Sequence, residues 1–139
     1  MKPETAQRIL VFMLRMMGVL SVAAVAAIFM PHAWMNWFHE TMGMGELPDL
    51  PVVSYLSRSL SGFYLFFGAV VLYLARDVIR YLELIRFWAR FGLVFATVSL
   101  YIDVTAKLPI WWIISEVGFL FTFFLYVSFL LKKIERARP

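Results

Sequence analysis

The chain has 139 residues, of which 63% are apolar and only 16% are charged. Soluble domains usually contain about 45–50% apolar and about 25% charged residues, so this composition excludes a disordered chain and a water-soluble enzyme domain. The chain contains no cysteine, which excludes disulfide frameworks, thiolate nucleophiles and cysteine-ligated metal centres. With a mean hydropathy of +0.81, the sequence predicts a polytopic membrane protein.

The first apolar segment covers residues 9–30 and is closed by Pro31. It could instead be a signal peptide, because Ala24-Val25-Ala26 resembles a small-residue cleavage site. Arg15 interrupts the apolar run, which is unusual in a signal peptide. We therefore interpret the segment as an uncleaved transmembrane helix.

An outer loop, residues 31–51, follows this helix and carries both histidines of the chain, His32 and His39. Three further apolar segments come after it, at about residues 52–75, 87–106 and 110–131. Each is close to the roughly 20 residues that cross a bilayer as a helix. Because hydrocarbon offers no hydrogen-bond partner to the backbone, these segments must be helical. The prediction is one all-α domain, a four-transmembrane-helix up-and-down bundle.

The orientation follows from lysine and arginine, which accumulate on the cytoplasmic side of membranes. Only Arg58 and Lys107 fall on the outer side of the predicted topology, together with five acidic residues. The remaining eleven basic residues share the inner side with four acids, which gives a net charge of +7 inside and −3 outside. Those eleven are Lys2, Arg8, Arg15, Arg76, Arg80, Arg86, Arg90, Lys132, Lys133, Arg136 and Arg138.

Both termini are therefore predicted to be cytoplasmic, in a bacterial inner membrane. The basic rim also explains the overall charge of +4 as membrane topology and as attraction to anionic inner-leaflet lipids. We do not expect nucleic acid as a partner.

Small residues recur on one stripe of each of the last two segments, where helices in membranes approach closely. In the third segment the stripe leads from Gly92 to Asp103, and in the fourth it comprises Ser115, Gly118 and Thr122. We expect both stripes to face the interior of the bundle.

Three ionisable residues lie inside the predicted spans and are not explained by topology: Arg58, Asp103 and Glu116. Arg58 and Glu116 are each six residues from a helix end, which places them roughly 9 Å deep. The short turn at Lys107 makes the last two helices antiparallel neighbours, so Asp103 and Glu116 should lie close together. Two such carboxylates repel each other unless a cation intervenes.

Two interpretations of this group remain open. Intramembrane charges commonly pair with one another, so Arg58, Asp103 and Glu116 could form a structural ion-pair network, with Lys107 sharing Asp103. Alternatively they line an outward-facing polar site that binds a small ligand or a lipid head group. The side chains expected to support such a site are Ser54, Ser61, Ser99, Tyr101 and Lys107.

The outer loop offers a candidate metal site, because His32 and His39 lie among four methionines and imidazole and thioether groups suit copper(I). The seven-residue spacing with two tryptophans between the histidines also describes an amphipathic helix at the membrane surface. We prefer this second interpretation and predict neither a metal nor another cofactor.

The stretch from Arg58 through Gly62 and Tyr64 to Gly68 resembles the Arg-x3-Gly-x5-Gly region of small four-helix bacterial membrane proteins of the DoxX-like kind. Pro31 and the segment from Leu108 to Glu116 resemble the same type. The resemblance implies a four-helix membrane bundle and no catalytic residue.

Signatures of nucleotide-binding loops, hydrolases and zinc proteases are absent from the sequence. The leading hypothesis is a ligand-binding or lipid-binding membrane protein, or an accessory subunit of a membrane complex. The alternatives are a small transporter or an oligomeric channel, and then a membrane-embedded isomerase or oxidoreductase. A chain this short could also form a homo-oligomer.

Overall fold

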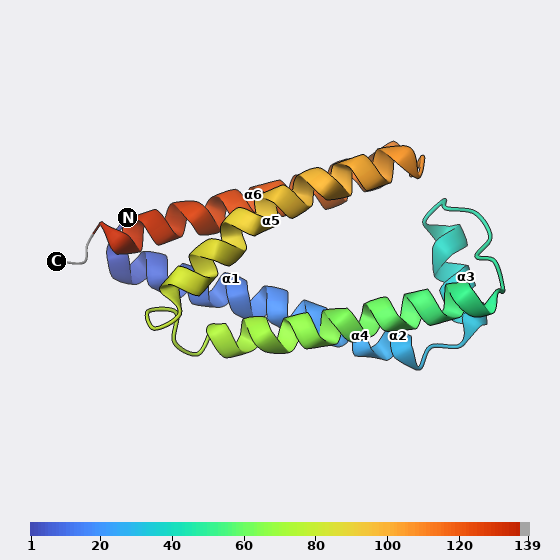
Figure 1. Ribbon diagram of the computed structural model, residues 1–139, viewed down its shortest axis with the longest axis horizontal. Helices are drawn as coiled ribbons and strands as arrows, with labels where there is room; N and C mark the ends of the chain where they lie inside the picture. Colours follow the sequence, from blue (N-terminus) through green and yellow to red (C-terminus); the bar gives the residue numbers. More distant parts are fainter. Residues whose placement is uncertain (137–139) are drawn as a thin grey trace. The chain divides into compact units, whose positions relative to one another are not determined.

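The computed structural model describes residues 1–136, and all regular secondary structure in that range is helical (Figure 1). Arg138, one of the basic residues assigned to the inner side, lies outside the described residues. The helices are α1 (Pro3–Ala23), α2 (Val25–Ile28), α3 (His32–Thr41), α4 (Pro51–Leu74), α5 (Leu82–Thr105) and α6 (Ile110–Glu135).

Four helical stretches of the described chain are long and apolar enough to cross a membrane. They are Pro3–Ile28, which joins α1 to α2, and the three helices α4, α5 and α6. The sequence-based prediction of four membrane-spanning helices is therefore confirmed at the level of length and composition.

The first span differs from its predicted bounds at both ends. It begins at Pro3 rather than at residue 9, because proline fits the first position of a helix, where its missing N–H costs nothing. It breaks after Ala23 and ends at Ile28. At the break, Ala24 N donates to Ser21 O and Ala27 N donates to Ala24 O, which are the three-residue bonds of a tightened turn.

The last two helices are longer at their polar ends than the apolar segments indicate. Helix α5 begins at Leu82, five residues earlier than expected, and α6 ends at Glu135, four residues later. Lys132 and Lys133 lie in the last turn of α6, where positive charge stabilises the exposed carbonyl groups. An apolar segment in the sequence indicates only the part of a helix that lies in the hydrocarbon, so the polar turns at the helix ends are not predicted from it.

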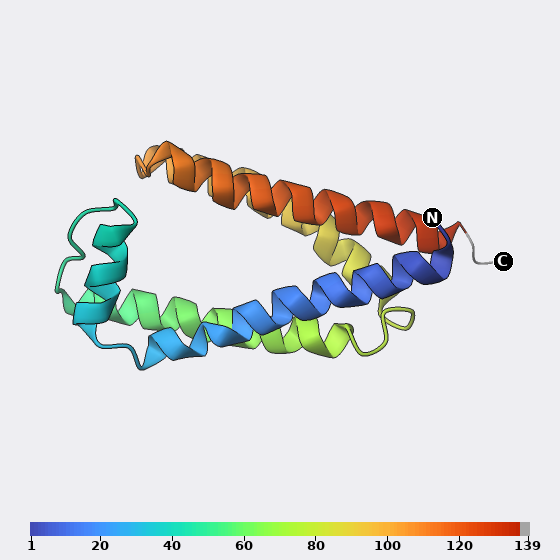
Figure 2. The same cartoon turned by 180° about the vertical axis from the view of Figure 1, so that it is seen from behind.

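The chain forms two compact units, one made of Met1–Met13 with the chain from Leu74 onwards, the other of Leu14–Tyr73. In the first unit, the first turns of α1 lie beside the last turns of α6, near the start of α5 (Figures 1 and 2). The largest side chains buried there almost completely are Leu10, Val78, Ile85, Val127, Leu130 and Leu131.

Antiparallel α5 and α6 lie side by side over most of their length (Figures 1 and 2). The α5 stripe from Gly92 to Asp103 is buried, as expected. A Cβ atom on Gly92 would collide with the ring of Phe124, so this ring occupies the space that glycine leaves. Helix α6 packs through residues such as Phe124, whereas its small residues Ser115, Gly118 and Thr122 are exposed, contrary to expectation.

In the second unit, α4 runs beside the second half of α1 (Figure 2). The two backbones approach each other closely at Gly18 and Gly68, since a Cβ atom on Gly68 would lie 2.7 Å from the carbonyl oxygen of Gly18. Any larger residue at position 68 would have to push the two backbones apart. Close backbone approach through small residues is typical of membrane helix pairs.

Candidate functional site

Asp103 lies near the C-terminal end of α5, on the stripe that faces α6. The residue is only 5% exposed. Its Oδ2 atom is buried and has no hydrogen-bond partner among residues 1–136. Buried polar atoms in native proteins nearly always have a partner, so an unpartnered carboxylate oxygen requires an explanation.

The end of α5 fixes the position of Asp103. Leu108 N donates to Asp103 O at 3.1 Å, and Lys107 N donates to Val104 O at 3.2 Å. These two bonds form a Schellman motif, in which the residue after the C-cap adopts the left-handed conformation. Lys107 occupies that position, with φ 56°. Pro109 then begins the approach to α6, so Asp103 is held one turn from the hairpin connection.

Glu116 enters the same region from α6. Asp103 is three turns beyond Gly92, about 16 Å along α5, and Glu116 is two turns before Phe124, about 12 Å along α6. Because the helices are antiparallel, both displacements lead from the Gly92–Phe124 contact toward the same end of the hairpin. The charge of Asp103 acts on the Glu116 carboxyl group, which also interacts with Trp112 one turn earlier.

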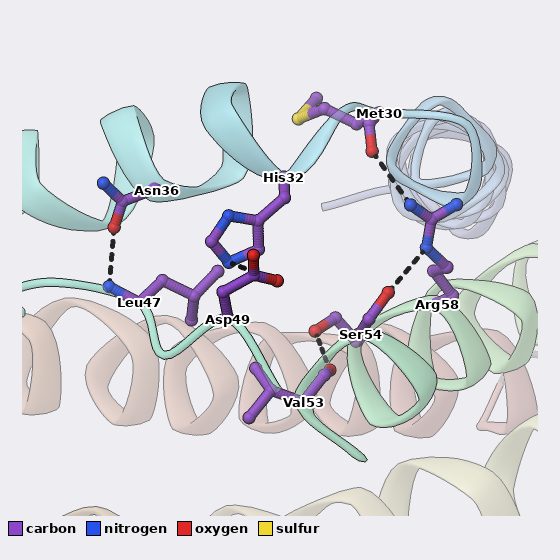
Figure 3. Close-up of polar contacts among 9 residues, drawn as sticks. Met30, His32, Asn36, Leu47, Asp49, Val53, Ser54 and Arg58 are labelled. Atoms are coloured by element: carbon purple, nitrogen blue, oxygen red, sulfur yellow. Dashed lines mark hydrogen bonds and ion pairs between the residues drawn. The ribbon is translucent and has the colours of Figure 1, made fainter. Parts of the chain in front are cut away.

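Arg58 lies in the second turn of α4, in the other unit, and its guanidinium group binds backbone carbonyl groups. Nη1 donates to Ile28 O at 2.5 Å and Nη2 donates to Met30 O at 3.3 Å. Nε donates to Ser54 Oγ at 3.1 Å (Figure 3). The last carbonyl groups of a helix have no partner within the helix. Arg58 therefore caps the end of the first span, a task that suits its fork of donors.

Asp103 and Glu116 are thus brought together by the hairpin, and Arg58 is held by the loop before α3. The pairing of Arg58 with the two carboxylates stays a prediction.

The residues expected to support the site have varied surroundings. Ser99 is buried on the Asp103 stripe. Ser54 accepts the bond from Arg58, and Ser61 Oγ donates to Ser57 O at 2.9 Å. Tyr101 is 72% exposed and lies on the opposite side of α5 from Asp103, since two residues correspond to about 200° around a helix. We leave Tyr101 out of the proposed site.

Lys107 forms no ion pair with Asp103 within residues 1–136. The turn that joins α5 to α6 therefore supplies no paired positive charge to Asp103.

The two histidines of the outer loop differ in their contacts: His39 forms a hydrogen bond, whereas His32 Nε2 is buried and has no hydrogen-bond partner among residues 1–136. His39 Nδ1 lies 2.7 Å from Gly45 O. His32 Nε2 lies 3.9 Å from Asp49 Oδ1, as Figure 3 shows. No group of three His, Asp or Glu residues that could hold a metal ion occurs among residues 1–136. His32 and His39 lie in α3, so this part of the outer loop is helical, and its position at the membrane surface stays a prediction.

Two polar contacts were not anticipated from the sequence. One is the carbonyl capping by Arg58, which depends on where the first span ends. The other is Arg86, which forms ion pairs with Glu83 on its own helix and with Glu135 at the end of α6. The second contact could have been predicted from the sequence. Arg86 lies at the start of a predicted helix, and acidic residues lie near the ends of both helices.

Comparison of the chain with protein-family models, with curated proteins and with solved structures gives no match.

Proposed function

We propose that this chain is a small integral membrane protein that binds a monovalent cation or a proton between Asp103 and Glu116. The observation that carries the proposal is the buried, unpartnered Oδ2 atom of Asp103 beside a second acidic side chain. Ionisable residues within membrane-spanning helices commonly mark ion or proton sites.

The electrostatics favours a positively charged occupant. Burying a carboxylate without a partner costs several kcal/mol, and a second carboxylate nearby adds repulsion. A proton on Asp103, or a small cation between the two carboxylates, removes both costs, and a proton on Glu116 removes the repulsion. An anionic ligand would increase the repulsion.

In this proposal Arg58 has a structural role and does not bind the ligand. Its guanidinium nitrogens donate to Ile28 O, Met30 O and Ser54 Oγ, so we assign it to holding the first span against α4. A lipid head group or another anion at Arg58 would have to compete with these carbonyl groups. The acidic pair is the better candidate for ligand binding.

The test compares thermal stability of the purified protein with and without cations. Unfolding is followed in detergent while Na⁺, K⁺ or methylammonium replaces tetraethylammonium at constant ionic strength and pH. A ligand that binds only the folded state raises Tm in proportion to the logarithm of its concentration. We expect one cation to raise the Tm of the parent, and Asp103→Asn and Glu116→Gln to lose that response. Glu46→Gln, an exposed acid, is the matched control.

A second arm separates a proton from a metal or organic cation. If the occupant is a proton, no cation raises Tm, and the infrared band of a protonated carboxyl group at neutral pH disappears in Asp103→Asn or Glu116→Gln. The proposal is overturned if no cation and no such band is found and both substitutions only lower Tm. In that case the acids serve the fold.

Transport is the second candidate function, because carboxylates within a membrane also line ion and proton pathways. In liposomes this would be visible as cation or proton flux that disappears with Glu116→Gln. Binding without flux would identify a ligand-binding protein or an accessory subunit.

We also propose that both termini lie in the cytoplasm, that the four spans form an up-and-down bundle, and that the membrane is a bacterial inner membrane. The excess of basic residues on one side supports this orientation, as does the position of the start of α1 beside the end of α6. The same basic rim would attract anionic lipids. The relation to DoxX-like proteins and a homo-oligomeric assembly stay predictions.

The absence of cysteine in the sequence makes the orientation easy to test. Single cysteines at position 46, in the outer loop, and at position 80, in the connection before α5, are labelled in intact cells with a membrane-impermeant maleimide. We expect Glu46→Cys to react and Arg80→Cys to react only after lysis. The reverse pattern would invert the topology.

A further inference from the structure

Helix α3 has two chemically different faces. On one face, Asn36 Oδ1 accepts a hydrogen bond from Leu47 N at 2.6 Å (Figure 3). His32 and His39 contact Asp49 and Gly45 of the same following loop. This face is therefore attached to the chain segment between α3 and α4.

The opposite face carries three aromatic side chains. Trp34, Trp37 and Phe38 are 63%, 58% and 43% exposed, respectively. They lie within about 100° of one another around the helix. Together they line an open apolar hollow, and the rings of Trp37 and Phe38 stand edge to face at 4.8 Å. Three neighbouring exposed aromatic rings are unusual for a surface in water.

The chain on both sides of α3 fixes the level at which the helix lies. The first span ends at Ile28 and the next begins at Pro51. Arg58 joins the two, since it donates to the carbonyl groups of Ile28 and Met30 from the second turn of α4. Only Pro31 separates this anchored stretch from the first residue of α3. The helix is thereby held at the end of two membrane spans.

We propose that α3 lies in the outer boundary between lipid head groups and acyl chains, with Trp34, Trp37 and Phe38 inserted among the lipids of the same membrane. Tryptophan is enriched at this depth because its ring is amphipathic. Residues 31–50 contain three acids and no lysine or arginine, so attraction to anionic lipids does not contribute. The occupant is the apolar and interfacial part of any phospholipid.

The inference rests on the membrane insertion proposed above and is independent of the acidic pair. It is tested with a variant that keeps only Trp34 and Trp37, made by Trp88→Phe, Trp111→Phe and Trp112→Phe. This variant is reconstituted with phosphatidylcholine brominated either near the head group or near the chain end. For rings about 5–10 Å into the boundary, we expect about twofold stronger quenching by the shallow bromines.

Two comparisons make the outcome decisive. A variant that retains only Trp111, in the first turn of α6, reports whether the protein is inserted at all. Vesicles with and without phosphatidylglycerol report whether lipid charge matters, and we expect the same ratio in both. Circular dichroism and gel filtration identify any variant that has lost its fold, and single Trp→Phe substitutions then replace the triple one.

The proposal is overturned if Trp111 is quenched by bromolipid while Trp34 and Trp37 are quenched only by aqueous iodide. It is equally overturned if neither quencher reaches them, because the aromatic face would then be covered by protein, such as a second copy of the chain. If Trp111 also escapes bromolipid, membrane insertion itself fails, which is a different result.

Discussion

Arg58 and Asp103 are both ionisable residues in helices that can span a membrane, yet their surroundings are opposite. Arg58 is half-buried and its three nitrogens all donate, two of them to backbone carbonyl groups at the end of the first span. Asp103 is almost fully buried, and one of its carboxylate oxygens has no partner within residues 1–136. Arg58 supplies hydrogen-bond donors to carbonyl groups that have no partner within the helix. Asp103 creates an electrostatic cost that the described side chains do not offset.

This difference separates structure from candidate function. A satisfied charge stabilises the fold whether or not a ligand exists. A buried acid that lacks a partner reduces stability until something positive joins it. Substitutions at the two positions should therefore change stability in opposite directions. Two further substitutions, at Gly92 and Lys107, test the packing and the turn that position Asp103, and the four tests follow in decreasing order of effect.

The largest effect is expected for Arg58→Met. The methionine keeps much of the side-chain volume but leaves the carbonyl groups of Ile28 and Met30 without their donor. An unpartnered buried carbonyl group costs about 1–3 kcal/mol, and the two carbonyl groups here are only part-buried. Taking the lower part of that range for each, we expect a loss of about 2–3 kcal/mol in unfolding free energy. Denaturation of the purified protein by sodium dodecyl sulfate in mixed micelles measures it.

Arg58→Lys serves as the graded control, since an ammonium group can reach one carbonyl but not both in a fork. Its stability should lie between those of the parent and Arg58→Met. Equal stability of all three proteins would show that Arg58 does not cap the first span.

Gly92→Ala should reduce stability by about 2 kcal/mol, the usual range for overpacking a tight contact. The added Cβ atom collides with the ring of Phe124. The contact between Gly92 and Phe124 in the parent sets the register of the two helices, and this register brings Glu116 close to Asp103. We also expect any cation response of Tm to weaken. Thermal unfolding of the variant with and without cation measures both effects.

Gly118→Ala is the matched control in the same hairpin, because a Cβ atom there meets nothing within 4 Å. Alanine in an open helical position should raise stability by about 0.5–1 kcal/mol. If both alanine variants behave alike, the Gly92–Phe124 contact does not determine the packing of α5 on α6.

The sequence predicts the α5–α6 hairpin better than it predicts the role of Arg58. Helical periodicity places Gly92 and Asp103 on one stripe, and the short turn at Lys107 makes the next helix a neighbour, so local rules suffice. The cap on Ile28 and Met30 connects residues about thirty positions apart and depends on the first span ending at Ile28 rather than at the predicted residue 30. Such a contact is a product of tertiary packing.

The packing surface of α6 shows a second limit of sequence reasoning. Small residues at Ser115, Gly118 and Thr122 indicated the buried face, but Phe124 occupies the space above Gly92 instead. A contact between helices needs a small residue on only one side. The sequence alone does not show which helix supplies it.

Asp103→Asn should raise the unfolding free energy by about 1 kcal/mol in the absence of a bound cation, because replacing a poorly compensated buried charge by a neutral group is often stabilising. The amide keeps the shape of the side chain. Thermal unfolding in tetraethylammonium chloride, where no small cation is present, measures the change.

Glu46→Gln is the control for this substitution. It removes a negative charge from the exposed loop and should leave stability within about 0.5 kcal/mol of the parent.

A loss of stability in Asp103→Asn comparable to that in Arg58→Met would mean that Asp103 has a structural partner. The contrast between Arg58 and Asp103 would then disappear.

The smallest effect is expected for Lys107→Gly. The left-handed conformation of Lys107, with φ 56°, costs a residue with a side chain about 1–2 kcal/mol, which glycine avoids. Glycine loses more conformational freedom on folding, about 0.5–1 kcal/mol, so the net gain in unfolding free energy should be about 0.5 kcal/mol. Since Lys107 forms no ion pair with Asp103 among the described residues, the cation response of Tm should be unchanged. A loss of stability, together with a stronger cation response, would show instead that Lys107 shields the acidic pair, and Asp103 would then be a partnered charge like Arg58.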